Sequence, residues 1–320
     1  MARPAQDVFV AERQPRWNEL DRLLSGKALH RQDGATIANV AALYRAVCSD
    51  LMRARSAGYG PDLLAFLDGL VSRAHNAIYG AQPLRLPDFL AGIFVEFPRA
   101  LRRNWVFFLC STALFCIPLI IGIIAGYGSR EIASSIMPAS ALEGMVDAYS
   151  TGFDQGRGTG EDAQMAGFYV YNNVGIAFRC FATGILFCLG SVFFLVYNGL
   201  VIGVVTGFVG AAGHGHNILT FMCGHAPFEL TAILIAGGAG LQMGWALVDT
   251  GGRTRVGSLR RAAPDIGRLV IGAGCMLVIA AAVEGFWSPS SLPPPVKWPA
   301  AAIFSAAVAA YLGFAGRRRA

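Results

Sequence analysis

The sequence predicts an all-α, polytopic helical membrane protein with about six transmembrane helices and an N-terminal cytoplasmic helical module. Of its 320 residues, 54% are hydrophobic and only 14% are charged, whereas soluble domains carry about a quarter charged residues. About half of the acidic and basic side chains lie in the first 103 residues, and long apolar segments fill the rest. These observations predict a water-facing module at 1–103 and a transmembrane domain at 104–320.

The N-terminal module is expected to be a small bundle of short helices, because apolar residues recur there at helical spacing. The three apolar stripes are Phe9, Trp17, Leu20, Leu23 and Leu24, then Val40, Leu43, Tyr44, Val47 and Leu51, then Leu63, Phe66, Leu67, Leu70 and Val71. The net positive charge of the module suits an anionic lipid surface and does not require nucleic acid. We therefore expect membrane lipids, and no nucleic acid, among its partners.

Six segments are apolar and long enough to cross a bilayer core, which takes roughly 20 residues. They lie at about 104–127, 168–189, 191–211, 222–248, 269–287 and 298–314. The stretch 168–211 is too long for one span, so we divide it near Gly190 into two helices joined by a very short turn. A loop at 128–167 follows the first span.

Arginine clusters set the expected direction of the spans, because cytoplasmic loops carry an excess of Lys and Arg. The clusters are Arg99, Arg102 and Arg103, then Arg253, Arg255, Arg260, Arg261 and Arg268, then Arg317, Arg318 and Arg319. The loop at 128–167 is predominantly acidic, and the loop at 212–221 has no Lys or Arg. Both loops are therefore expected outside, and six spans with both termini in the cytoplasm satisfy every cluster.

Glycines recur every four residues on two of the spans, at Gly199, Gly203 and Gly207 and at Gly240 and Gly244. Small residues at this spacing let helix backbones approach closely in membranes. We interpret them as helix-packing positions. The sequence does not separate packing within one chain from packing between two, so a homodimer is possible.

Three charged residues in apolar surroundings are the main candidates for a functional site. Arg179 is the only charged residue between Phe168 and Ala211, and Glu229 and Glu284 lie in similar settings. Buried charges in membranes usually have a partner or face water. Arg179 is therefore expected to pair with one of the two carboxylates, and Arg179→Ala is expected to destabilise the protein.

His225 and Glu229 are four residues apart and share a helix face, so they are expected to pair. His214 and His216 lie just upstream, and these three histidines with Glu229 are the residues that a metal site would use. Their spacing matches no strong metal motif. No metal, no cofactor and no catalytic residue is therefore predicted.

The remaining polar candidates are Asn172, Asn173 and Asn198. With Arg179, His225, Glu229 and Glu284 they are expected in the outer half of the membrane. One interpretation is a sealed polar network with Arg179 as its hub, and the other is a water-accessible site for an ion, a lipid headgroup or a small solute.

Several short motifs follow one another in an order that resembles the stage II sporulation protein M family, in its non-sporulating branch. They are Asn172-Asn173, Phe181 to Gly184, Tyr197-Asn198-Gly199, His225 with Glu229, the glycine-rich run from Ala236 to Leu241, and Glu284-Gly285-Phe286. N-terminal segments around Phe9, Trp17 and Tyr44 resemble the cytoplasmic leader of this family. The resemblance covers nearly the whole chain.

In spore formers the founding member of this family is an integral membrane component of the engulfment machinery. It acts with two peptidoglycan-degrading proteins and is thought to anchor them. The resemblance therefore implies a non-enzymatic scaffold in the bacterial inner membrane, with protein partners on the cytoplasmic face, the outer face or both. The alternatives are a transporter or channel-like subunit and, third, an intramembrane metal-dependent enzyme that uses His225 and Glu229.

Overall fold

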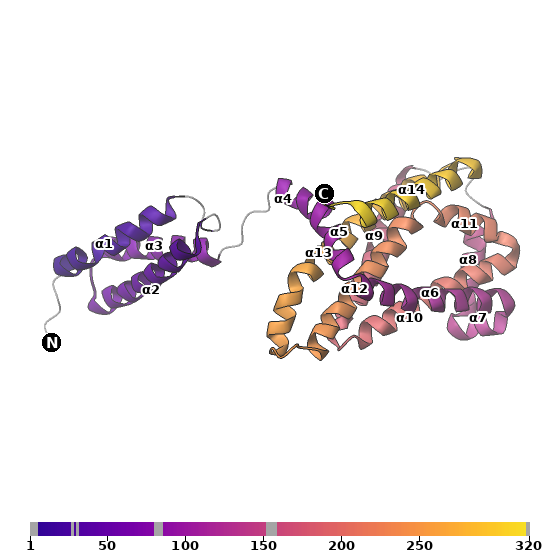
Figure 1. The fold of residues 1–320 in the computed structure, drawn as a ribbon. Coiled ribbons are helices and arrows are strands. Elements are labelled where there is room, and N and C mark those ends of the chain that lie inside the picture. Colours follow the sequence, from indigo (N-terminus) through magenta and orange to yellow (C-terminus); the bar gives the residue numbers. More distant parts are fainter. Residues whose placement is uncertain (1–5, 27–28, 30–31, 80–85, 152–158, 318–320) are drawn as a thin grey trace. The chain divides into compact units, whose positions relative to one another are not determined.

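The computed structural model describes residues 6–26, 29, 32–79, 86–151 and 159–317, with the backbone alone at 159–166. Every regular element among these residues is helical (Figure 1). In this described part of the chain, five helices are long and apolar enough to cross a membrane. The predicted class, an all-α multi-pass membrane protein, is confirmed.

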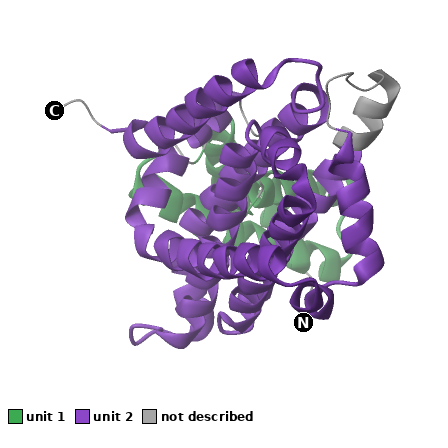
Figure 2. Cartoon of the chain, turned by 90° about the vertical axis from the view of Figure 1, so that its right-hand side faces the viewer, with its two compact units in different colours: residues 1–85 green, residues 86–320 purple. Residues whose placement is uncertain are grey.

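The chain divides into two compact units, Met1–Arg85 and Leu86–Ala320 (Figure 2). The first unit contains α1 (Gln6–Leu24), α2 (Gly34–Ala57) and α3 (Pro61–Tyr79). The predicted apolar stripes supply its core, in which Trp17, Val40 and Leu67 are fully or almost fully buried. This unit therefore has a hydrophobic core of its own.

A buried carboxylate ties the first two helices of this unit together. Asp50 on α2 accepts hydrogen bonds from Arg13 (2.6 Å) and from the indole Nε1 of Trp17 (3.1 Å), both on α1. Both oxygens of the carboxylate thus have a donor, as a buried charge requires.

The boundary between the units lies at Arg85, so the predicted boundary at residue 103 is too late. The segment from α4 (Leu86–Ala91) through a π-helical turn (Gly92–Glu96) to α5 (Phe97–Arg103) packs on the membrane bundle. Phe97 is 1% exposed, and its ring lies where a Cβ on Gly272 would be. This apolar contact holds the segment to the second unit.

The second unit continues with α6 (Trp105–Gly128), α7 (Arg130–Ile136), α8 (Ala139–Ser150), α9 (Thr159–Ala182), a 3-10 turn (Thr183–Ile185), α10 (Leu189–Val209), a π-helical turn (Gly210–His214), α11 (Gly215–Met222), α12 (Ala226–Val248), α13 (Arg255–Ala282), a second such turn (Val283–Trp287) and α14 (Pro294–Phe314). The five membrane-spanning candidates are α6, α10 with α11, α12, α13 with its π turn, and α14. The sixth expected span, 168–189, falls largely on α9, of which residues 167–182 are described with their side chains. The α-helical path is interrupted between Thr183 and Cys188, close to the expected division at Gly190. Phe187 and Cys188 both have positive φ there.

Helices α6 and α10 touch backbone to backbone through glycines from both sides. A Cβ on Gly199, Gly203 or Gly207 would collide with backbone atoms of α6, and one on Gly122 or Gly126 would collide with backbone atoms of α10. The helix-packing role predicted for the three α10 glycines is thus their role in the structure.

Helix α12 is the central helix of the bundle, with neighbours on nearly every side. A Cβ on Gly240 would meet the carbonyl oxygens of Cys180 and Phe181, and one on Gly244 would meet the backbone of Gly184 and Cys188. All five predicted packing glycines therefore lie at contacts between helices of the same chain. A homodimer remains a prediction that would need another surface.

The arginine clusters around residues 100, 260 and 317 meet at one end of the bundle. Arg102 donates to the carbonyl oxygens of Leu312 (2.6 Å) and Ala315 (2.7 Å), and Arg103 forms a two-pronged ion pair with Asp265 (2.6 and 3.1 Å). The hydrogen bond to Asp265 raises the pKa of Arg103. Arg318 and Arg319 lie outside the described residues. The common side expected for the clusters agrees with these contacts.

We expect Gly203→Val to force α6 and α10 apart, because its side chain would enter the backbone of Leu119 and Gly122. Overpacking of this kind costs about 1–3 kcal/mol in soluble cores, so the melting temperature of the detergent-purified protein should fall clearly. Gly274→Val is the matched control, because a Cβ there meets nothing within 4 Å. Equal melting temperatures for the two variants would contradict the packing role of Gly203.

Candidate functional site

A cluster of polar side chains lies where α12 begins and α13 ends. His225 is the N-cap residue of α12, and Glu229 follows one helical turn later. Glu284 lies in the π-helical turn that continues α13, and Asn173 lies on α9. Three separate helical segments thus bring their polar side chains to one place.

The imidazole of His225 lies between the two carboxylates. Its Nε2 atom is 3.9 Å from Oε2 of Glu229 and 3.9 Å from Oε1 of Glu284. One ligand atom from each of the three residues lies within 4.8 Å of the other two. The closeness of His225 to Glu229 agrees with their spacing on the helix, although no hydrogen bond joins them, and Glu284 approaches from the end of α13.

Neighbouring groups fix the orientation of these side chains. The hydroxyl of Ser288 lies 3.0 Å from Nδ1 of His225, so the opposite ring nitrogen faces the carboxylates. Asn173 donates to Oε2 of Glu284 (3.1 Å), and Asn172 donates to Asn173 (3.0 Å). Lys297 donates to the carbonyl oxygens of Ser288 and Ser290, both at 2.8 Å.

The three titratable side chains are largely buried, with exposed fractions of 6% for His225, 13% for Glu229 and 9% for Glu284. Oε2 of Glu229 is a buried atom that has no hydrogen-bond partner among the described residues. Carboxylates in such surroundings are costly unless a positive charge or a proton compensates them. Glu229 therefore needs either a proton or a cationic partner.

A cavity of about 250 Å³ reaches the cluster. Asn172, Asn173, His225, Glu229 and Glu284 form its polar wall. Its aromatic lining is Tyr149, Phe168, Tyr169 and Phe221. The cavity gives the cluster space for a small ligand, and its mixed lining is typical of ligand sites.

Arg179 does not belong to this cluster, and the prediction that it is the hub is wrong. Its side chain is exposed, and no described carboxylate forms an ion pair with it. It lies in the last turn of α9, about 9 Å along the axis from Asn173 and on another face of the helix. The expected pairing with Glu229 or Glu284 is therefore absent among the described residues.

The position of Arg179 along the bundle explains why it needs no buried partner. Its neighbour Cys180 packs on Gly240, which is about 16 Å along α12 from Glu229. The turn after α9 lies at the end where the guanidinium of Arg255 lies over the ring of Phe187. Arg179 is therefore near the arginine-rich end, and long basic side chains near span ends can reach the interface.

Three other predicted residues also lie elsewhere. Asn198 donates to the carbonyl oxygen of Phe194 on its own helix (2.7 Å). His214 and His216 flank the start of α11, and neither belongs to the group of potential metal ligands found among the described residues.

Sequence reasoning missed Ser288 and Lys297. Lys297 is buried, and a lysine beside an apolar span is a signal that the sequence does contain. Ser288 carried no signal, because a serine after a span resembles any loop residue.

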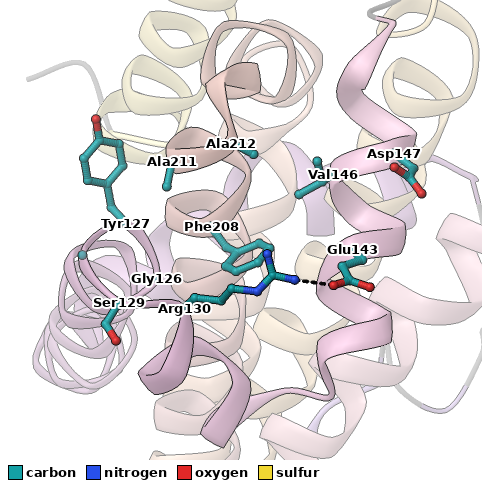
Figure 3. Close-up of a pocket in the computed structure, with 11 residues that line it drawn as sticks. Gly126, Tyr127, Ser129, Arg130, Glu143, Val146, Asp147, Phe208, Ala211 and Ala212 are labelled. Carbon is teal, nitrogen blue, oxygen red and sulfur yellow. Dashed lines mark hydrogen bonds and ion pairs between the residues drawn. The ribbon is translucent and has the colours of Figure 1, made fainter.

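A second cavity, of about 350 Å³, lies beside the α7–α8 hairpin (Figure 3). Arg130 on α7 forms an ion pair with Glu143 on α8 and lies over the ring of Phe208 on α10. Asp147 lines the same cavity. The acidic residues expected in the 128–167 loop therefore lie partly on an ordered helical hairpin.

Comparison with known proteins assigns the membrane bundle to a family. The family model "Stage II sporulation protein M" matches residues 111–289, which is more than half of the chain. The chain belongs to this family. A separate model, "Domain of unknown function (DUF8413)", matches residues 7–80 in the first compact unit. No curated protein and no solved structure matches the chain.

The cluster of this family member lies within the matched segment, which contains Asn173, His225, Glu229, Glu284 and Ser288. Lys297 lies beyond it. The predicted family is thus confirmed for the membrane bundle, whereas the N-terminal segments match the separate model, and the polar cluster belongs to the segment that the family model matches.

We expect Asn173→Leu to be more destabilising than Arg179→Ala. The leucine leaves Oε2 of Glu284 without this donor, and losing a partner of a buried polar group costs about 1–3 kcal/mol. Exposed substitutions usually change stability by less than about 0.5 kcal/mol. Thermal unfolding of the two purified variants tests this order, with Asn198→Leu as a control outside the cluster. A larger fall in melting temperature for Arg179→Ala than for Asn173→Leu would contradict this order and support Arg179 as the central charge.

Proposed function

We propose that this stage II sporulation protein M family member is a non-enzymatic scaffold of the bacterial inner membrane. It anchors partner proteins, with cell-envelope or peptidoglycan-remodelling factors as the expected class. The observation that carries the proposal is the autonomous three-helix unit at the N-terminus. A membrane bundle that carries such a unit provides a docking surface together with an anchor.

Two features support the independence of this unit. Its core residues pack against one another, with the buried Asp50 held by Arg13 and Trp17. It also matches a family model of its own, separate from the one that matches the bundle. A domain that folds around its own core can be retained for a binding role of its own.

An aromatic surface on α2 and α3 is the proposed docking site of this unit. Tyr44, His75 and Tyr79 pack together, with ring centroids 5.1 to 6.3 Å apart, and Tyr79 is 67% exposed. Exposed aromatic side chains are enriched among residues that dominate binding energy at protein interfaces. This surface suits a protein partner on the cytoplasmic side.

The α7–α8 hairpin supplies a second proposed docking surface, on the opposite side of the membrane in the predicted topology. Its cavity presents Glu143 and Asp147 around the aromatic face of Phe208. Such a surface suits a partner that offers a basic side chain. Two surfaces on opposite sides would let one chain link cytoplasmic and outer proteins.

A transporter or channel-like subunit is the second candidate, and the cavity at the polar cluster favours it. That cavity reaches His225, Glu229 and Glu284. Uptake of a cationic solute by vesicles containing the purified protein would support this candidate over the scaffold.

We expect Tyr79→Ala combined with His75→Ala to remove a cytoplasmic partner from the complexes that the full-length protein forms. Losing a strong interface residue costs on the order of 2 kcal/mol, which is about 30-fold in affinity. Crosslinking in native membranes followed by mass spectrometry measures the recovered partners. Glu143→Arg should likewise remove a partner of the hairpin, because it reverses the charge presented there.

Matched controls separate docking from folding. Met52→Ala removes an exposed apolar side chain from the same unit, and Glu131→Arg reverses an exposed charge on α7. Both controls should leave the complexes unchanged. Identical crosslinked partners for wild type and both test variants would count against the scaffold proposal.

A further inference from the structure

We propose that His225, Glu229 and Glu284 bind a divalent transition-metal ion inside the membrane bundle. The sequence had favoured a structural His225–Glu229 pair with no metal, because the three histidines and Glu229 matched no metal motif. The structure replaces His214 and His216 with Glu284, which comes from another helix. This site is independent of the scaffold proposal.

The spacing of the ligand atoms is close to that of a loaded site. Ligands about 2.1 Å from a tetrahedral ion lie roughly 3.4 Å from one another. In the structure each carboxylate oxygen is 3.9 Å from Nε2 of His225. All three ligand atoms lie within 4.8 Å of one another. A loaded site therefore needs a closure of about 0.5 Å for each histidine–carboxylate pair and at most about 1.4 Å between the two carboxylate oxygens, which rotations of these side chains can supply.

The outer shell of the site has the arrangement that metal-binding histidines usually have. Such a histidine makes a hydrogen bond through its second ring nitrogen, which fixes its orientation. Here the hydroxyl of Ser288 is hydrogen-bonded to Nδ1 of His225, and Nε2 faces both carboxylates. Asn173 holds one oxygen of Glu284, and the other oxygen is the one that faces His225.

Glu229 is the independent sign that something is bound here. Its Oε2 is buried and has no hydrogen-bond partner among the described residues, although it points toward His225 and Glu284. When Glu229 is ionised, a divalent cation would give this oxygen a partner of opposite charge. A metal ion satisfies both the orphaned oxygen and the charge.

The π-helical turn that continues α13 brings two groups to the same imidazole. Glu284 and Ser288 are both buried and both contact His225. A π-helical turn is wider than an α-helical turn, and single turns of this kind are frequent at functional sites. Glu284 and Ser288 are four residues apart and so lie on one face, and this face supplies both a ligand and the hydroxyl that orients the histidine.

The donor set identifies the class of ion. One imidazole nitrogen and two carboxylate oxygens suit zinc and its neighbours such as manganese, iron and cobalt. Calcium and magnesium prefer oxygen ligands alone, and copper(I) prefers sulfur. The cavity of about 250 Å³ leaves room for water or a ligand at a further coordination position.

The test measures zinc in the full-length protein, purified in detergent without a polyhistidine tag. After loading and extensive dialysis, we expect close to one zinc per chain by mass spectrometry of the element. We also expect zinc to raise the melting temperature of the apoprotein. Co²⁺ in place of zinc should give the visible absorption of a four-coordinate site.

Glu284→Gln and Glu229→Gln keep the side-chain shape and remove one anionic ligand each, so zinc affinity should fall at least tenfold. Ser288→Ala removes only the group that orients His225, and outer-shell changes cost roughly 10- to 100-fold in metal affinity. The double variant His214→Ala with His216→Ala and the surface variant Glu131→Gln should both keep wild-type zinc content.

Two results would overturn the proposal. The first is a wild-type protein that retains no zinc and gains no thermal stability from it, a result that needs no variant to fold. The second is equal zinc content in wild type and Glu284→Gln, or loss of zinc in the His214 and His216 variant alone, which would place any bound metal elsewhere.

Discussion

The close packing of α12 is the constraint on which the rest of the bundle depends. Gly240 and Gly244 let α12 approach the backbone around Cys180 and Cys188, and Gly238 lies against the backbone of α6. Helices in lipid gain little from burying apolar surface, so contact between backbones is a main source of their association. A side chain at any of these glycines would displace a neighbouring helix and everything that helix carries.

The polar cluster follows from this packing. With α9, α12 and α13 held in contact, the end of the bundle opposite the clustered arginines brings His225, Glu229, Glu284 and Asn173 into one small volume. Burial then makes every unpaired oxygen expensive. Asn173 and Ser288 give hydrogen bonds to Glu284 and His225. A divalent cation would give the unpartnered oxygen of Glu229 its partner. The same close packing thus supports both the stability of the bundle and the proposed metal chemistry.

Much of the fold could be read from the sequence, because it depends on local patterns. Length and hydropathy mark the membrane helices, helical periodicity marks the core of the N-terminal unit, and glycine spacing marks the α6–α10 contact. The boundary of the first unit was missed because Phe97 packs on Gly272, a residue far away in the sequence. The pairing of His225 with Glu229 was predictable since both lie on one face of one helix.

The sequence by itself determined the fold class, the packing glycines and several members of the polar cluster. Only the tertiary structure decided which of these residues meet. Arg179 and Glu284 look equally anomalous in the sequence, yet their contacts depend on where each helix ends and how it is rotated. A helix turns its side chains by about 100° per residue and rises 1.5 Å, so Arg179 leaves the face and the level of Asn173 within two turns. Glu284 lies beside His225 because α13 and its π-helical turn pack against α12 and α9.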